Sequence, residues 1–87
     1  MAIKVEVFST NSCPHCPAAI EAANNAKAKF GEKIDVESIK IDESEENYKR
    51  AIEYQIMAVP TIVIDGEVVF VGTPTEAELN DKLESLL

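Results

Sequence analysis

Basic residues are scarce in this sequence. Eight lysines and arginines stand against sixteen aspartates and glutamates, which leaves a formal net charge of −8 at pH 7. Nucleic-acid affinity comes largely from Lys and Arg clustered on one face of a protein. The composition therefore argues against a nucleic-acid-binding protein. The acidic excess indicates no partner by itself, because such charge most often serves solvation.

Long apolar runs are also missing. No stretch approaches the roughly 18 apolar residues that a membrane-spanning helix needs. Residues 1–7 alternate in polarity and carry charge early, unlike the apolar region of a signal peptide. We therefore expect a cytoplasmic protein with no membrane partner.

Cysteine occurs only twice, too rarely for the multi-bridge framework that holds small secreted domains together. Hydrophobic residues make up 46% and charged residues 28% of the 87 positions, a globular balance. The chain has no linker, internal repeat or low-complexity run. Its length predicts a single domain over residues 1–87.

Periodicity and end signals predict the elements. Alternating Ile3, Val5 and Val7 predict a half-buried strand over about 2–8, with Lys4 and Glu6 on its polar face. An Ala-rich helix is expected over 18–30, ended by Gly31 as a cap. A second strand is expected over 35–42, with a bulge or register shift between its apolar positions 36 and 39.

The second half of the chain continues this alternation of helices and strands. Ser44 is an N-cap candidate for a helix whose apolar positions recur through 48, 51, 52 and 56. An apolar strand over 61–64 and a strand over 67–71 flank Asp65-Gly66, a two-residue hairpin signal. Thr75 and Glu78 form a capping-box pattern before the last helix, which carries Leu79, Leu83 and Leu86.

The predicted order is β-α-β-α-β-β-α. The first β-α-β unit should be a right-handed crossover between parallel strands, and the hairpin must be antiparallel. Together they predict an α/β fold, a four-stranded mixed sheet with three helices.

The sequence Cys13-Pro14-His15-Cys16 lies where the first helix should start. With Cys13 as N-cap, the helix dipole would favour its thiolate, the species that attacks disulfides. Cys16 lies about one turn later, close enough for a disulfide across a short ring. Pro14 suits the first helical position, and His15 could lower the pKa of the Cys13 thiol. Pro17 would then remove the first helical hydrogen bond, so the helix could start slightly later.

Other interpretations of these residues stay open. The two cysteines could be inert buried thiols, or half of a zinc site, although tetrahedral zinc needs four ligands and only His15 is nearby. His15 could be an exposed loop residue without a role. We expect no metal and no cofactor.

A second element is Val59-Pro60-Thr61 at the start of the third predicted strand. Proline cannot donate a hydrogen bond to the ladder, so its place there is unusual. A cis Val59–Pro60 bond would explain it and leave the Val59 backbone free to pair with an extended substrate segment.

With the dithiol after the first strand, Val59-Pro60-Thr61 opening the third and Gly72 closing the fourth, the whole chain resembles the thioredoxin superfamily. It looks most like small archaeal thioredoxins of glutaredoxin-like size. The resemblance implies the sheet order 2-1-3-4 and a cis Val59–Pro60 bond packed against the disulfide. It also implies a substrate groove around Cys13, Pro14, Val59, Pro60 and Gly72, with Thr61 beside it.

Some residues depart from the family. Many thioredoxins have Trp before the first Cys and Gly-Pro between the cysteines; here Ser12 and Pro14-His15 stand there. A buried Asp commonly serves as proton acceptor on the strand before the dithiol, but Val5 and Val7 occupy that face. Glutaredoxins hold glutathione with a basic residue before the dithiol and a Gly-Gly and Asp pattern after the last strand, and this chain has neither.

The resemblance implies a thiol–disulfide oxidoreductase. Cys13 would attack protein disulfides, Cys16 would resolve the mixed disulfide, and a thioredoxin-reductase-like donor would recharge the pair. We expect a monomer. The alternatives are glutaredoxin-like activity, a disulfide oxidase or isomerase, and a non-catalytic metal or cluster binder through Cys13 and Cys16.

Overall fold

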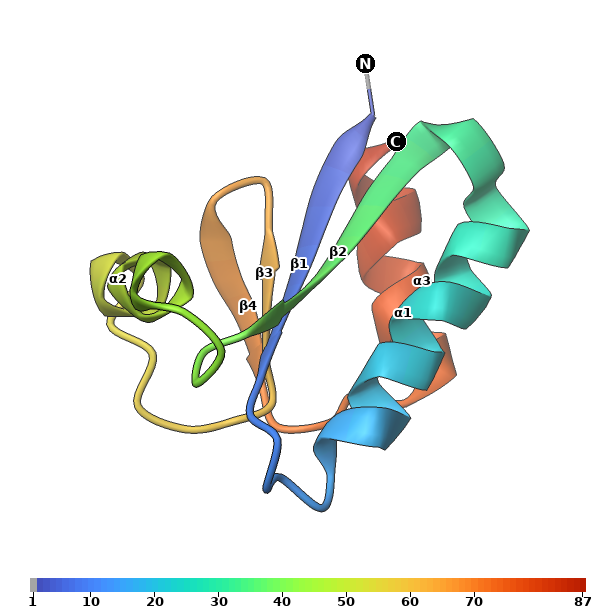
Figure 1. Cartoon of the computed structure of the whole chain (residues 1–87). Coiled ribbons are helices and arrows are strands. Elements are labelled where there is room, and N and C mark those ends of the chain that lie inside the picture. The colour runs from blue at the N-terminus through green and yellow to red at the C-terminus, as the bar shows by residue number, and fades with distance from the viewer. Residues whose placement is uncertain (1) are drawn as a thin grey trace.

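A computed structural model describes residues 2–87, a four-stranded sheet with helices on both faces (Figure 1). The elements are β1 (Ile3–Ser9), α1 (Cys16–Phe30), a short 3-10 helix (Gly31–Lys33), β2 (Ile34–Lys40), α2 (Glu45–Glu53), β3 (Thr61–Ile64), β4 (Glu67–Val71) and α3 (Glu76–Leu86). No helix within residues 2–87 combines the length and apolarity that crossing a membrane requires.

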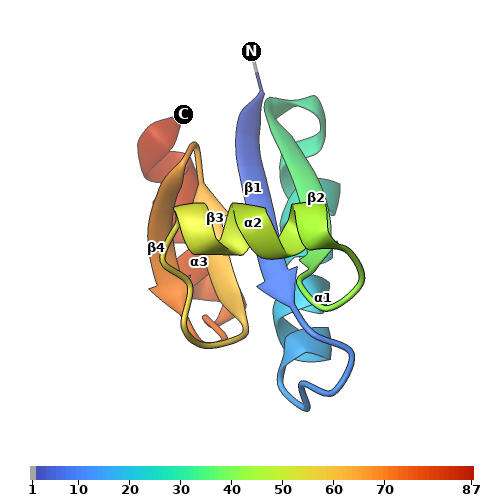
Figure 2. The same ribbon diagram turned by 60° about the vertical axis from the view of Figure 1, so that its left-hand side comes forward.

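The sheet order is β2-β1-β3-β4, as predicted. β1 and β2 are parallel, whereas β3 runs antiparallel to both β1 and β4. Helices α1 and α3 cover one face of the sheet, and α2 crosses the other (Figure 2). This is the thioredoxin fold that the sequence resemblance implied, and it brings the ends of β1 and β4 and the start of β3 to the same edge.

Two apolar layers hold the helices to the sheet. On the α1 and α3 face, alternating β1 residues pack against alanines of α1 and leucines of α3, including Val5, Val7, Ala19, Ala23, Leu79 and Leu83. Small alanines let α1 lie close to the sheet. The layer under α2 is smaller and consists of Phe8, Ile39, Ala51 and Val63. An apolar layer on each face accounts for the three-layer arrangement.

Several local signals are confirmed. The Ser44 hydroxyl accepts a hydrogen bond from the Asn47 amide at 3.1 Å, and Thr75 with Glu78 forms a complete capping box. Asp65 and Gly66 take φ values of 50° and 84°, the positive values that a two-residue hairpin of type I′ requires. Gly31 caps α1 at φ 59°. Each signal depends on residues close together in the chain.

Three sequence expectations are wrong. The register of β1 with β2 is continuous, so the bulge expected between Val36 and Ile39 is absent there; an irregularity occurs instead between Ile62 and Val63, opposite β4. Ile56 lies beyond α2, because that helix ends at Glu53. β1 extends through Ser9, one residue beyond the strand predicted over about 2–8.

Burial of Glu6 overturns the prediction of a half-buried first strand. Only 4% of Glu6 is exposed, because α2 crosses the face to which it points. Its carboxylate pairs with the guanidinium of Arg50, and the Tyr54 hydroxyl donates to it at 3.4 Å. Burial, together with this carboxylate, raises the pKa of Tyr54.

The charged cluster extends from Arg50 across the sheet surface. Arg50 also donates to Glu37 at 3.1 Å, and Lys4 pairs with the same carboxylate at 3.0 Å. Hydrogen bonds from Lys4 and Arg50 lower the pKa of Glu37. The cluster therefore links α2 to β1 and β2 on the face that carries little apolar surface.

Candidate active site

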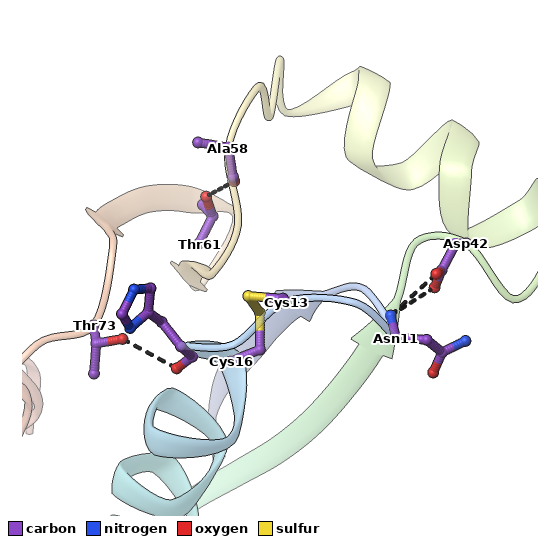
Figure 3. Close-up of a disulfide and its surroundings, with 8 residues drawn as sticks. Asn11, Cys13, Cys16, Asp42, Ala58, Thr61 and Thr73 are labelled. Atoms are coloured by element: carbon purple, nitrogen blue, oxygen red, sulfur yellow. Dashed lines mark hydrogen bonds between the residues drawn. A yellow bond between two sulfur atoms is a disulfide. The ribbon is translucent and has the colours of Figure 1, made fainter.

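Cys13 and Cys16 form a disulfide at the edge where β1 ends and α1 begins (Figure 3). Their Cα atoms are 5.4 Å apart, within the range for a disulfide. Cys13 is partly exposed, whereas Cys16 is 2% exposed. The pair therefore has one sulfur that a partner protein can reach and one that lies inside.

The start of α1 differs from the prediction. His15, not Cys13, is the N-cap residue, and Cys16 is the first residue of the helix. Pro17 then falls in the first turn, where backbone amides have no helical partner, so it removes no helical hydrogen bond. The first bond of the helix runs from the Ala19 amide to the His15 carbonyl at 3.4 Å. The amide-rich end of the helix thus points at the disulfide from the Cys16 side.

The loop before Cys13 is held in place by a residue that follows the neighbouring strand β2. The backbone amide of Asn11 donates to the Asp42 carboxylate, with its two oxygens at 3.0 and 3.3 Å. The Cys13 amide donates to the Thr10 carbonyl at 3.4 Å. Asp42 follows β2, which is parallel to β1, so the two strand ends lie together and the contact spans the loop (Figure 3).

Replacing Asp42 should loosen this loop. Asp42→Ala removes the acceptor for the Asn11 amide, and a hydrogen bond to a charged group is worth about 1.5 kcal/mol at an exposed site. We expect amide hydrogen exchange at Asn11 to accelerate about tenfold, measured by NMR. Asp42→Asn keeps an acceptor oxygen and should retain most of the protection. Equal exchange rates in wild type and Asp42→Ala would show that the contact does not order the loop.

The opposite side of the site is built from the start of β3 and the end of β4. The Val59–Pro60 bond is cis, as the resemblance implied. The Thr61 hydroxyl donates to the Ala58 carbonyl at 2.7 Å, and the Gly72 amide donates to the Pro60 carbonyl at 2.7 Å. The segment before Pro60 is thereby fixed to both strands.

A further contact ties this side to the dithiol. The Thr73 hydroxyl donates to the His15 carbonyl at 3.3 Å, beside the disulfide (Figure 3). The sequence analysis included neither Thr73 nor Asp42 in the site. Asp42 lies in the turn that follows β2, a strand parallel to β1, and this position is a signal that could have identified it. Thr73 carries no comparable signal, because its partner lies 58 residues away.

The structure brings the sequence-predicted residues together at one edge. Pro14 and His15 are exposed beside the disulfide, Val59 and Gly72 are half-buried, and Pro60 and Thr61 are buried. Val71 is 70% exposed and pairs with Thr61 across the strands. The edge thus combines an accessible disulfide with apolar and backbone surface.

Chemically, such an edge suits an extended peptide. Residues 2–87 form no closed pocket, and no three His, Cys, Asp or Glu side chains among them are grouped to hold a metal ion. Thiol–disulfide exchange needs only an accessible sulfur, a second thiol within disulfide distance and a surface to orient the partner. All three features are present here.

Comparisons with known proteins agree with this geometry. Residues 1–84 match the family described as the thioredoxin domain. A Probable Thioredoxin of Methanothermobacter thermautotrophicus is 50% identical over 88 residues, covering 97% of this chain and 100% of that protein. Thioredoxin of Methanocaldococcus jannaschii is 41% identical over 85 residues, covering 98% and 96% respectively.

Two solved structures are similar in fold. Thioredoxin-2 of the malaria parasite, described as a component of its protein secretion machinery, matches with a TM-score of 0.83 at 15% identity, covering 97% of this chain and 82% of that one. Chloroplastic thioredoxin z matches with a TM-score of 0.82 at 16% identity, covering 98% and 78%. At these identities the likeness concerns the fold.

Proposed function

The chain belongs to the thioredoxin family, and from this premise we propose that it reduces disulfides in other proteins and is recharged by a thioredoxin-reductase-like electron donor. Family membership and the Cys13–Cys16 disulfide support thiol–disulfide oxidoreductase chemistry. The direction of electron flow, the substrate class and the roles of the two sulfurs are our proposal.

The difference in exposure between the two cysteines carries the proposal. Cys13 is partly exposed and Cys16 is 2% exposed. In the reduced protein the Cys13 thiolate attacks a substrate disulfide, forms a mixed disulfide and releases one substrate sulfur as a thiolate. Cys16 then attacks Cys13, the second substrate sulfur leaves, and both substrate sulfurs take protons from water. Two electrons pass from the dithiol to the substrate.

The substrate segment would lie over the groove around Cys13, Pro14, Val59, Pro60 and Gly72, with Thr61 beneath it. The bond from Thr61 to the Ala58 carbonyl and the bond from Gly72 to the Pro60 carbonyl hold this bent backbone in place. A backbone that is held in place can pair with an extended chain, and the side chains beside it then select the substrate. His15 and Pro14 would tune the dithiol from its exposed side.

We further propose that the chain acts as a monomer, as a single domain over 1–87, in the reducing environment of the cytoplasm. A dithiol that donates electrons must be kept reduced there by a donor of lower potential. Four archaeal relatives carry the name thioredoxin or probable thioredoxin, which supports this assignment over a glutaredoxin-like or metal-binding role.

A redox titration tests the direction of electron flow. We expect the Cys13–Cys16 pair, equilibrated with defined dithiol buffers, to have a potential near or below about −250 mV, because such a dithiol reduces most exposed protein disulfides. Free thiols are counted at each buffer ratio, and insulin reduction by the reduced protein provides the activity. A potential above about −180 mV would identify an oxidant or isomerase instead.

A further inference from the structure

Ser9, the last residue of β1, carries a buried hydroxyl without a hydrogen-bond partner. Only 1% of Ser9 is exposed, and its Oγ is the buried side-chain polar atom of residues 2–87 for which no partner is present. The two other buried polar side chains are satisfied, since Glu6 pairs with Arg50 and Thr61 donates to Ala58. Buried polar groups are paired in nearly all folded proteins, so Ser9 calls for a physical reason.

The position of Ser9 relates it to the dithiol. Ser9 follows Val5 and Val7 at the two-residue spacing of a strand whose pairing with β2 is regular through Ser9 itself. Its side chain therefore lies on their face of the sheet, which α1 and α3 cover. Helix α1 runs back along β1 in the opposite direction, so its first turn, with Cys16, lies at the end of the strand occupied by Ser9 (Figure 1).

Cys16 needs a polar neighbour when the disulfide opens. Its sulfur then becomes a thiol or thiolate, and Cys16 is 2% exposed, so water reaches it poorly. Removing a thiolate from water is costly unless a hydrogen-bond donor replaces the solvent. The β1 side chains before Ser9 on this face, Val5 and Val7, offer no polar group.

We propose that the Ser9 hydroxyl donates a hydrogen bond to the Cys16 thiolate in the reduced protein, and that it has no partner in the disulfide form because that acceptor is then bonded to Cys13. This assignment rests on the proposed function. The serine takes up no proton: the Cys16 thiol loses its proton to water, the thiolate attacks Cys13, the Cys13–Cys16 bond forms and the substrate sulfur leaves. The hydroxyl stabilises the attacking thiolate throughout.

A test of this role must account for the other titratable groups near Cys16, because they could also shift its pKa. Cys13 and His15 are its titratable neighbours in the chain, and His15 is exposed. Uncharged residues at this edge are Val7, Ser9, Thr61, Gly72, Thr73 and Pro74, and the charged group there is the Asp42 carboxylate, which accepts from the Asn11 amide on the loop before Cys13. A shift in the ionisation of Cys16 can therefore be assigned once His15 is controlled, since Asp42 is the same in every variant compared.

A titration of Cys16 alone tests the proposal. In the Cys13→Ser background Cys16 is the single thiol, and its thiolate is followed by ultraviolet absorbance against pH. Adding Ser9→Ala should raise the pKa of Cys16 by about one unit, a tenfold loss in thiolate formation. Ser9→Thr keeps the hydroxyl and should leave the pKa near that of the parent. Ser38→Ala, an exposed serine on β2, serves as the matched control.

A second readout uses the protein with both cysteines. At a pH above the pKa of Cys16, where the reduced form carries the thiolate, Ser9→Ala removes the partner of that form, so the dithiol–disulfide equilibrium should shift about tenfold toward the disulfide, or about 30 mV. The same shift should occur in a His15→Ala background. An unchanged Cys16 pKa in Ser9→Ala, or equal pKa values in Ser9→Ala and Ser9→Thr that both exceed the parent value, would overturn the proposal.

Neither readout depends on turnover. If the protein fails to reduce insulin, the proposed function fails, while the Cys16 titration still reports on Ser9. If insulin is reduced and Ser9→Ala leaves the Cys16 pKa unchanged, the function stands and the role of Ser9 does not.

Discussion

Cys16→Ser protein is expected to accumulate as a covalent complex with its substrate, whereas Cys13→Ser protein should lose turnover to the background rate. The reason is the proposed order of the two attacks. Cys13 is the sulfur that a partner can reach, and Cys16 is 2% exposed. Without Cys16, the mixed disulfide on Cys13 has no internal thiol to resolve it, and the complex persists until an external thiol enters.

The complex can be measured directly. Reduced Cys16→Ser protein is mixed with insulin, quenched with acid, and analysed by non-reducing electrophoresis and mass spectrometry. We expect a band whose mass equals the sum of one protein chain and one insulin chain, and it should disappear on reduction. Cys13→Ser protein should show little or none of this band under the same conditions.

Ser12→Ala is the matched control. Ser12 is exposed next to Cys13, so this variant changes the same loop without removing a sulfur. It should reduce insulin at a rate close to that of the wild type and form no lasting complex. A persistent complex in Cys13→Ser but not in Cys16→Ser would reverse the assigned roles, and turnover in Cys13→Ser would remove Cys13 from the mechanism.

Local signals explain why much of the fold was predictable. The turn at Asp65-Gly66 and the capping box of Thr75 and Glu78 depend on residues within four positions of one another, and both are present as predicted. Because the side-chain period of a strand is two, the alternation of Val5 and Val7 also identified one core face correctly. These patterns suffice for the element order, whereas the sheet order came from the family resemblance.

Contacts between distant elements explain what was missed. Alternation separates the two faces of a strand but does not show which faces a helix will cover, so Glu6 was assigned to the polar side although α2 buries it. At the site, Pro14 and Pro17 are both compatible with a first helical turn, so the sequence could not distinguish Cys13 from His15 as the N-cap. The bond between Asn11 and Asp42 joins residues 31 positions apart.

Among single replacements of α2 side chains that are not buried, Arg50→Ala is expected to cause the largest loss in the free energy of unfolding. The Glu6 side chain is 5% exposed and pairs with the guanidinium, so Arg50→Ala leaves a buried carboxylate without its charged partner. Breaking a buried ion pair from one side costs about 3–5 kcal/mol. Because 31% of the Arg50 side chain is exposed, water can reach the Glu6 carboxylate once the guanidinium is removed. We therefore expect a loss of about 3 kcal/mol, the lower end of this range.

The measurement is urea unfolding at neutral pH, followed by circular dichroism. A loss of this size is a large share of the roughly 5–15 kcal/mol that stabilises a typical small protein, so the midpoint should fall clearly. Glu37→Gln is the matched control, since it removes the other carboxylate partner of Arg50. The Glu37 side chain is 40% exposed. Glu37→Gln removes two exposed pairs, with Arg50 and with Lys4, each worth about 0–1 kcal/mol, so the control should lose less stability than Arg50→Ala.

A double replacement separates the buried charge from the loss of packing. In Glu6→Met with Arg50→Met, neither charge remains and the methylene stems are largely retained, so most of the stability lost in Arg50→Ala should return. Stability of the double variant as low as that of Arg50→Ala would assign the loss to packing instead. Because residues 54–60 lead directly from α2 to Pro60, the charged cluster that holds α2 to the sheet also holds the start of the segment that forms the groove at its edge.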